Sequence, residues 1–239
     1  MDTFVVVLWV SVGVVVLAGV VALIVVASRR AAERTREHQA GMLAWAAQNG
    51  LTYAPSDPSL VTAWKGEPFI GGRTARALDV VTGHTARGRF FCSFVYEYVV
   101  STGKSSTTIR EAVLVVRLPA VLPDLLVTPE GLGDRIAKRF GGQDITCGSD
   151  AFDKAYRVRA ADEDYARALL GPVVTDWLLG PGQPLAPWRV AGPDLLSWRR
   201  MELAPEQILS GVALIDALID QLPRDMWGRY GRPDTRPVA

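Results

Sequence analysis

Side chains that commonly act as nucleophiles, bases or metal ligands are scarce in this chain. It has two histidines, His38 and His84, and two cysteines, Cys92 and Cys147, among 239 residues. Neither histidine has a second His or Cys at the spacing of a zinc site, so the sequence predicts no metal centre. Cys92 alternates with aromatic residues, which predicts a buried, unreactive thiol. Cys147 is expected to be more exposed, and its pairing with His84 as a catalytic dyad is a minor alternative.

The segment Gly103-Lys104-Ser105 comes nearest to a nucleotide-binding motif. A phosphate-binding loop needs a first glycine five positions upstream, where this chain has Tyr98. The residues that follow predict a strand, so no helix N-terminus would face an anion. Ser101 and Lys104 have the spacing of a serine–lysine nucleophile pair, but the further motifs of that enzyme class are missing. We therefore interpret this segment as a hairpin loop and predict no cofactor.

Two carboxylates, Asp216 and Asp220, lie four residues apart in the last predicted helix. Such a pair can perform acid–base chemistry or bind Mg²⁺. Both residues lie off the apolar stripe of that helix, so the more ordinary expectation is a solvated face. With the other candidates weighed in the same way, the sequence assigns no catalytic residue.

The longest uncharged segment is the apolar run from Phe4 to Ala27. A helix of this length spans roughly 36 Å, which is enough to cross a hydrocarbon core of about 30 Å. A cleaved signal peptide is the main alternative, but it needs a basic N-terminal region and a shorter apolar core. The sequence therefore predicts a transmembrane helix over residues 4–27.

Charges on either side of this run indicate its orientation. Asp2 precedes it, and four arginines follow it closely: Arg29, Arg30, Arg34 and Arg36. Basic residues are retained on the cytoplasmic side of a membrane. We therefore expect residues 1–3 outside the cytoplasm and the folded domain inside, in a single-pass protein of the cell membrane. The four arginines could also contact anionic lipid headgroups, although their role could be limited to fixing topology.

The remaining pattern predicts an α+β protein, with a mainly antiparallel sheet packed by three or more helices. A juxtamembrane helix is expected over 28–50, the soluble α+β domain over 51–222 and a disordered tail over 223–239. Strands are expected at 75–82, 89–100, 107–118, 125–127, 152–159, 188–191 and 195–201, and helices at 131–140, 162–179 and 205–222. An all-β barrel capped by the last helix, as in pleckstrin-homology-like domains, is the second architecture.

One strand, 89–100, is more sharply patterned than the others. Alternate positions carry apolar or aromatic side chains that should share one buried face: Phe90, Cys92, Phe94, Tyr96, Tyr98 and Val100. Aromatic residues on an open sheet can stack nucleic-acid bases, but basic residues are not interleaved here, so core packing is expected. The net charge of +1 agrees with this, because nucleic-acid binding usually needs a basic surface.

Several short motifs resemble those of uncharacterised single-span membrane-anchored proteins of GC-rich actinobacteria, a group with a domain of unknown function. The motifs are Val80-Val81-Thr82-Gly83, Phe91-x-x-Phe94-x-Tyr96, Leu118-Pro119 and Phe152-x-x-x-Tyr156-x-Val158. The resemblance would cover residues 51–222. Its motifs are packing and turn residues, so it implies a tethered domain and transfers no active site.

These observations favour a membrane-tethered, non-enzymatic interaction or accessory module. Its expected partners are the lipid bilayer and a protein of unknown identity, and no nucleic acid. Two alternatives stay open: a tethered hydrolase acting on lipid or envelope precursors, and a domain that binds anionic lipid headgroups. The hydrolase needs a pocket in which an acid, base or nucleophile has a perturbed pKa.

Overall fold

The computed structural model describes the backbone of residues 3–101, 103, 105–131, 144–181, 187–201 and 203–234. Side chains within these ranges are described except those of residues 3–16, 18 and 73. For more than half of the residues in the expected membrane span, Phe4 to Ala27, only the backbone is described. The expected helix at 131–140 lies outside it almost entirely. The chain divides into two compact units, Met1–Ala44 and Trp45–Ala239.

The first element is a single helix, α1 (Thr3–Gln48). It runs without interruption through the four arginines and the expected juxtamembrane segment. Gly50, which follows its end, has a φ of 67°. That left-handed conformation suits a glycine after a helix and explains why the helix stops here. In the part of the chain that is described, no helix combines the length and the apolarity needed to cross a membrane.

Six antiparallel strands form one sheet, which confirms the α+β expectation. They are β1 (Thr52–Ser56), β2 (Arg76–His84), β3 (Phe90–Ser101), β4 (Ser106–Pro129), β5 (Tyr156–Ala160) and β6 (Trp188–Arg199). The strand order is β1-β2-β3-β4-β5, and β6 also pairs with β4. β4 is long enough to pair with β3 through its first half and with β5 through its last residues, while β6 follows its other edge.

The length of β4 corrects the sequence prediction, which placed separate strands at 107–118 and 125–127, on either side of Pro119 and Pro123. The strand continues through both prolines, and its pairing with β6 shifts register on either side of Leu122. Proline cannot donate to a sheet ladder, so the chain accommodates it in a bulged stretch rather than by ending the strand. β6 was likewise expected as two strands, but it runs through Gly192, whose φ of 62° marks the matching irregularity.

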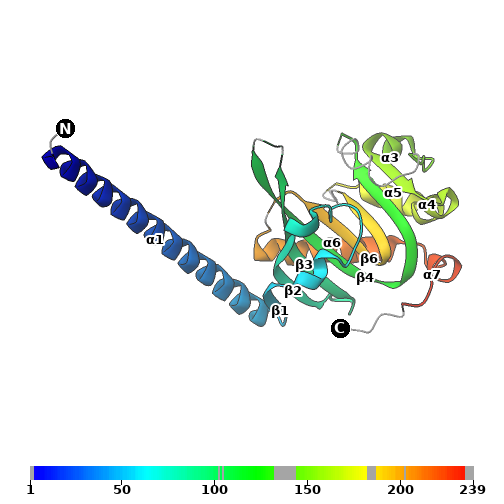
Figure 1. Ribbon diagram of the computed structural model, residues 1–239. Coiled ribbons are helices and arrows are strands. Elements are labelled where there is room, and N and C mark those ends of the chain that lie inside the picture. Colours follow the sequence, from blue (N-terminus) through cyan, green and yellow to red (C-terminus); the bar gives the residue numbers. More distant parts are fainter. Residues whose placement is uncertain are drawn as a thin grey trace. The chain divides into compact units, whose positions relative to one another are not determined.

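Short helices and turns complete the second unit. They are η1 (Pro58–Val61), η2 (Gly72–Thr74), α3 (Asp150–Ala155), α4 (Glu163–Leu169), α5 (Pro172–Leu179), α6 (Pro205–Gln221) and α7 (Met226–Arg229). α6 packs on β4, while α3 and α4 contact β5 (Figure 1). The helix predicted over 162–179 is present as α4 and α5: Asp162 caps α4 by accepting a hydrogen bond from the Tyr165 amide, and a break precedes Pro172.

Two further parts of the predicted pattern, a strand and the C-terminal tail, differ from the structure. The strand expected from Phe152 to Arg159 begins only at Tyr156, because Ser149 caps the short helix α3 before it. The tail expected to be disordered from residue 223 forms α7 and then pairs Arg232 with Val121. Met226 is buried, so apolar packing holds this part of the chain in place.

One face of the sheet packs against the segment that connects β1 and β2. On this face, the buried side chains of β3 include Cys92, Phe94, Tyr96 and Tyr98, which confirms most of the predicted alternation. Val100 is the exception, since it is exposed at the end of the strand. The segment 57–75, with η1 and η2, packs on this face through Leu60, Trp64, Phe69 and Ile70. We call it the covering segment.

Candidate functional site

A row of four side chains crosses the sheet at the start of β3. His84 of β2 pairs with Phe90 of β3, and Arg117 of β4 pairs with Asp194 of β6. Because Phe91 pairs with Val116, Phe90 stands beside Arg117 in the same register. The His84 ring is edge-on to Phe90 at 6.0 Å between centroids, and the Arg117 guanidinium lies 6.0 Å from the Phe90 centroid. The register of four strands thus brings an imidazole, an aromatic ring, a guanidinium and a carboxylate together.

Asp194 lies at the β6 end of this row and is held by hydrogen bonds. Its side chain is almost fully buried and accepts two hydrogen bonds, from Trp64 Nε1 and from Arg117 Nε, each at 3.0 Å. Arg117 Nη1 also donates to Asp234, at 3.0 Å, from the part of the chain that follows α7. A buried carboxylate needs such partners to offset its lost hydration. Asp194 therefore joins β4 and β6 to the covering segment.

A pocket of about 600 Å³ opens beside this row. Val80, Cys92 and Val115, which project from neighbouring strands, are among its apolar lining residues. Leu60, Ala63, Trp64 and Phe90 line it as well, and its polar lining residues are Thr52, Asp57, Ser59, Thr82, His84, Arg117 and Asp194. The volume and the mixed lining match those of small-molecule sites in proteins.

The thiol in this pocket is not an activated nucleophile. Burial, followed by the charges of Asp57 and Asp194, raises the pKa of Cys92 to about 12. With this raised pKa the group is a neutral thiol at physiological pH. A nucleophilic cysteine, by contrast, needs a lowered pKa. The predicted burial of Cys92 is confirmed.

Cys147 lies in a different part of the fold from His84. Its backbone amide donates to Asp153 Oδ1 at 2.9 Å, next to the start of α3. Burial is the main cause that raises the pKa of the Cys147 thiol, to about 11. The structure thus does not bring together the Cys147–His84 pair considered from the sequence. Among the described residues, no group of three or more His, Cys, Asp or Glu side chains is arranged to hold a metal ion.

Asp216 and Asp220 form an ion-pair cluster with the turn between β2 and β3. Arg89 bonds to Asp216 and, through Nη2 at 2.7 Å, to Asp220. Arg87 pairs with both carboxylates as well. The expected solvated face is wrong for Asp216, whose side chain is 2% exposed, and approximately right for Asp220 at 30%. The cluster attaches α6 to the sheet, so these carboxylates have a structural role.

The remaining candidates from the sequence lie in α1 and in the turn between β3 and β4. Arg29, Arg30, Arg34 and Arg36 are exposed along α1, and His38 is exposed on the same helix. Gly103 and Ser105 lie in the turn between β3 and β4, as the predicted hairpin requires, and Lys104 is outside the described residues. None of the described ones is among the residues that line the pocket.

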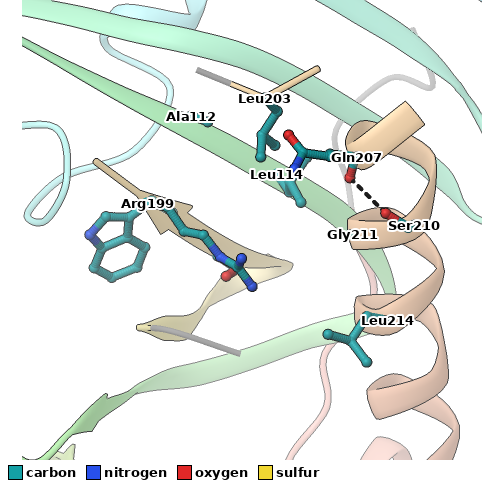
Figure 2. Close-up of a pocket in the computed structure, with 10 residues that line it drawn as sticks. Ala112, Leu114, Arg199, Leu203, Gln207, Ser210, Gly211 and Leu214 are labelled. Atoms are coloured by element: carbon teal, nitrogen blue, oxygen red, sulfur yellow. Dashed lines mark hydrogen bonds between the residues drawn. The ribbon is translucent and has the colours of Figure 1, made fainter. Parts of the chain in front are cut away.

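A second cavity of about 310 Å³ lies on the opposite face, between α6 and the strands β4 and β6. Figure 2 shows Leu114 and Leu214 beside this groove, with Arg199 reaching toward it from β6. Ser210 Oγ donates to the Gln207 carbonyl oxygen at 3.2 Å, so this hydroxyl is engaged within α6. The groove is smaller and lacks a buried charged group among its lining residues.

A buried acid was missed altogether by the sequence analysis. Glu111 of β4 pairs with Tyr96 of β3, and Arg200 Nε lies 3.6 Å from its Oε1. Its Oε2 atom is buried and has no hydrogen-bond partner among the described residues. Burial, and then the negative charge of Glu67 in the covering segment, raise the pKa of Glu111 to about 7, while Arg200 acts in the opposite direction. Glu111 comes directly before the apolar run from Ala112 to Val116, which is the sequence signal for this position.

Comparison with known proteins gives one significant structural likeness. The crystal structure of the mycobacterial trehalose monomycolate transport factor A, TtfA, is similar with a TM-score of 0.55 and 15% sequence identity. The likeness covers 81% of this chain and 96% of that one. At this identity it shows a shared fold. No protein-family model matches the chain, and no curated protein matches it significantly.

Proposed function

We propose that this chain is a non-enzymatic accessory module tethered at the inner face of a cell membrane, with a role in transport. The observation that carries the proposal is the fold shared with nearly the whole of a mycobacterial transport factor. The apolar run from Phe4 to Ala27, followed by four arginines, supports the tether and its orientation. We also propose that the chain belongs with the actinobacterial membrane-anchored proteins that it resembles in sequence.

The arrangement of the described residues favours a binding role over hydrolysis. A hydrolase needs a nucleophile or base with a suitably placed pKa. The pocket instead contains a thiol with a raised pKa, and Asp194 is engaged by Trp64 and Arg117. The carboxylates of α6 are paired with arginines. We therefore place the function in recognition of a partner or ligand.

Affinity purification of the tagged full chain from native membranes, in mild detergent, tests this proposal. We expect an integral membrane protein to co-purify in constant ratio. A matched chain without residues 1–27 should recover much less of it, because tethering raises the effective concentration of the domain at the membrane. Recovery of the chain alone, or equal recovery by the two chains, would count against the proposal.

Anionic lipid contact by α1 is the second candidate function. Arg29, Arg30, Arg34 and Arg36 are all exposed on a continuous helix just after the expected span. Basic residues near an anionic surface each contribute about 1 kcal/mol. Flotation of a chain without residues 1–27 should therefore be stronger with phosphatidylserine vesicles than with phosphatidylcholine vesicles. Replacing the four arginines by glutamine should weaken that binding at least about tenfold, and equal flotation with both lipids would reject the idea.

A further inference from the structure

The pocket beside Asp194 has an apolar interior bounded by polar groups. In one row across the sheet, Thr52 pairs with Thr82, Thr82 with Cys92 and Cys92 with Val115. The second row carries His84, Phe90, Arg117 and Asp194. One row thus ends in hydroxyl groups and continues into apolar side chains, whereas the other holds the charged groups. A ligand that fills this space must have an apolar part and a polar part.

The charges of the lining exclude a strong preference for an ionic ligand. Arg117 already bonds to two carboxylates, Asp194 and Asp234, so its charge is compensated and an anion would meet excess negative charge. Asp194 is engaged by Trp64 and Arg117 through both of its oxygens. Asp57 Oδ1 accepts bonds from the amide and hydroxyl of Ser59. These carboxylates are therefore already engaged within the protein, which weakens their attraction for a cation.

The polar side chains of the pocket lining suit an uncharged ligand instead. The hydroxyls of Thr52 and Thr82 can each donate and accept a hydrogen bond, and the imidazole of His84 is a further hydrogen-bonding group beside them. A hydroxyl-bearing head could exchange hydrogen bonds with these groups while an aliphatic body contacts Val80, Val115 and Leu60. Charged ligands would lose hydration without gaining an uncompensated counter-charge.

We propose that this pocket binds an amphiphile with an uncharged, hydroxyl-bearing head. The apolar body lies against Val80, Cys92 and Val115, and the head lies between the two threonines and His84. The inference goes beyond the accessory role proposed above and does not depend on it, because it rests on the pocket alone. If no membrane protein co-purifies, the ligand proposal is unaffected. If no ligand binds in the pocket, the tethering proposal is unaffected.

Photo-crosslinking on the full-length chain in phosphatidylcholine nanodiscs tests the proposal. Three probes carry the same octyl chain with a diazirine and differ only in the head: glucoside, sulfate or trimethylammonium. Mass spectrometry then locates the labelled peptides. We expect the glucoside to label peptides containing Leu60, Val80 or Phe90 at least threefold more than either charged probe. Excess unlabelled octyl glucoside should abolish this labelling.

Two neighbouring substitutions provide the matched pair. Ala63 and Thr62 are both exposed, but only Ala63 lines the pocket. Ala63→Trp should fill the space and reduce glucoside labelling at least threefold, whereas Thr62→Trp should leave it unchanged. The proposal is overturned by equal labelling with all three heads, by preference for a charged head, or by labelling confined to the 4–27 peptide. Equal labelling of the two variants, with the unlabelled glucoside failing to compete, would also overturn it.

Discussion

Glu111 combines near-complete burial with a position beside a second acid. An apolar, buried run of β4 follows it from Ala112 to Val116, and the covering segment brings Glu67 close to it across 44 residues of sequence. The ionised form is therefore unfavourable in the folded protein, and protonation is favoured up to about pH 7. This group should make the stability of the domain depend on pH around neutrality.

The sign of that dependence follows from linkage. The pKa of Glu111 is about 7 in the folded protein and 4.5 in its ordinary state, so the folded protein binds more protons between these values. The free energy of unfolding should fall as pH rises from about 5 to 7.5, by about 1 to 3 kcal/mol. Glu111→Gln should remove most of this fall. Urea unfolding of both chains across the pH range measures it, and parallel pH profiles would contradict the assignment.

Asp216 was wrongly predicted to be solvated, because its ion-pair partners are remote in the sequence. The helical period placed it beside the apolar stripe of α6, where a carboxylate usually faces water. Its partners, Arg87 and Arg89, lie in a turn almost 130 residues earlier, and no local pattern records that contact. Cys92 was judged correctly because its environment is set by its own strand, through alternation that can be read locally.

At the scale of elements, α6 is attached to the sheet by the ion-pair cluster as well as by apolar packing. Breaking a buried ion pair typically costs 3–5 kcal/mol, whereas exposed pairs contribute about 0–1 kcal/mol. Without the Asp216 charge, Asp220 is left to compensate both arginines, which moderates the loss. Asp216→Asn should therefore lower the free energy of unfolding by about 2–4 kcal/mol. Asp220→Asn, one turn further along the helix, should lower it by less than about 1 kcal/mol. Chemical denaturation of the two variants compares them, and equal losses would contradict this account of α6.

The covering segment depends on one close approach to β3. A Cβ atom on Gly71 would lie 2.3 Å from Tyr98 Cβ, which the strand backbone holds in place. The Gly71 amide also donates to the Tyr96 hydroxyl at 3.0 Å. Gly71→Ala should therefore push the segment away from the sheet and lower the free energy of unfolding by about 1–3 kcal/mol.

A matched glycine substitution controls for this effect. Gly41, within α1, has nothing within 4 Å of an added Cβ, so Gly41→Ala should be neutral or slightly stabilising. Thermal unfolding midpoints of the two variants give the comparison. A midpoint for Gly71→Ala at or above that of the unsubstituted chain would show that the covering segment is not held by this contact.

Elements were predictable wherever their signal was local. The alternation in β3 and the apolar stripe of α6 each arise from neighbouring residues, and each was located correctly. β4 was divided wrongly because two prolines ordinarily end a strand, and only pairing on both sides of it sustains the ladder here. Phe152 was assigned to a strand because a six-residue helix is too short to show a helical period.

At the scale of the whole molecule, the pocket could not be foreseen. Asp194 meets Trp64 across 130 positions and Arg117 across 77, and the register of four strands decides that they converge. His84 and Cys92 were recognised as chemically interesting from the sequence, yet their shared pocket follows from that same register. The apolar run from Phe4 to Ala27 is the opposite case, because its length and its flanking charges predict location without tertiary contacts.

The location of the folded unit is therefore the central claim, and single-cysteine accessibility in intact cells tests it most directly. In a chain whose Cys92 and Cys147 are replaced by alanine, a cysteine is introduced at Asp2 or at exposed Thr62. We expect a membrane-impermeant maleimide to label Asp2→Cys in intact cells and Thr62→Cys only after lysis, with both chains in the membrane fraction. Labelling of Thr62→Cys in intact cells, or recovery of the chain in the soluble fraction, would contradict the account.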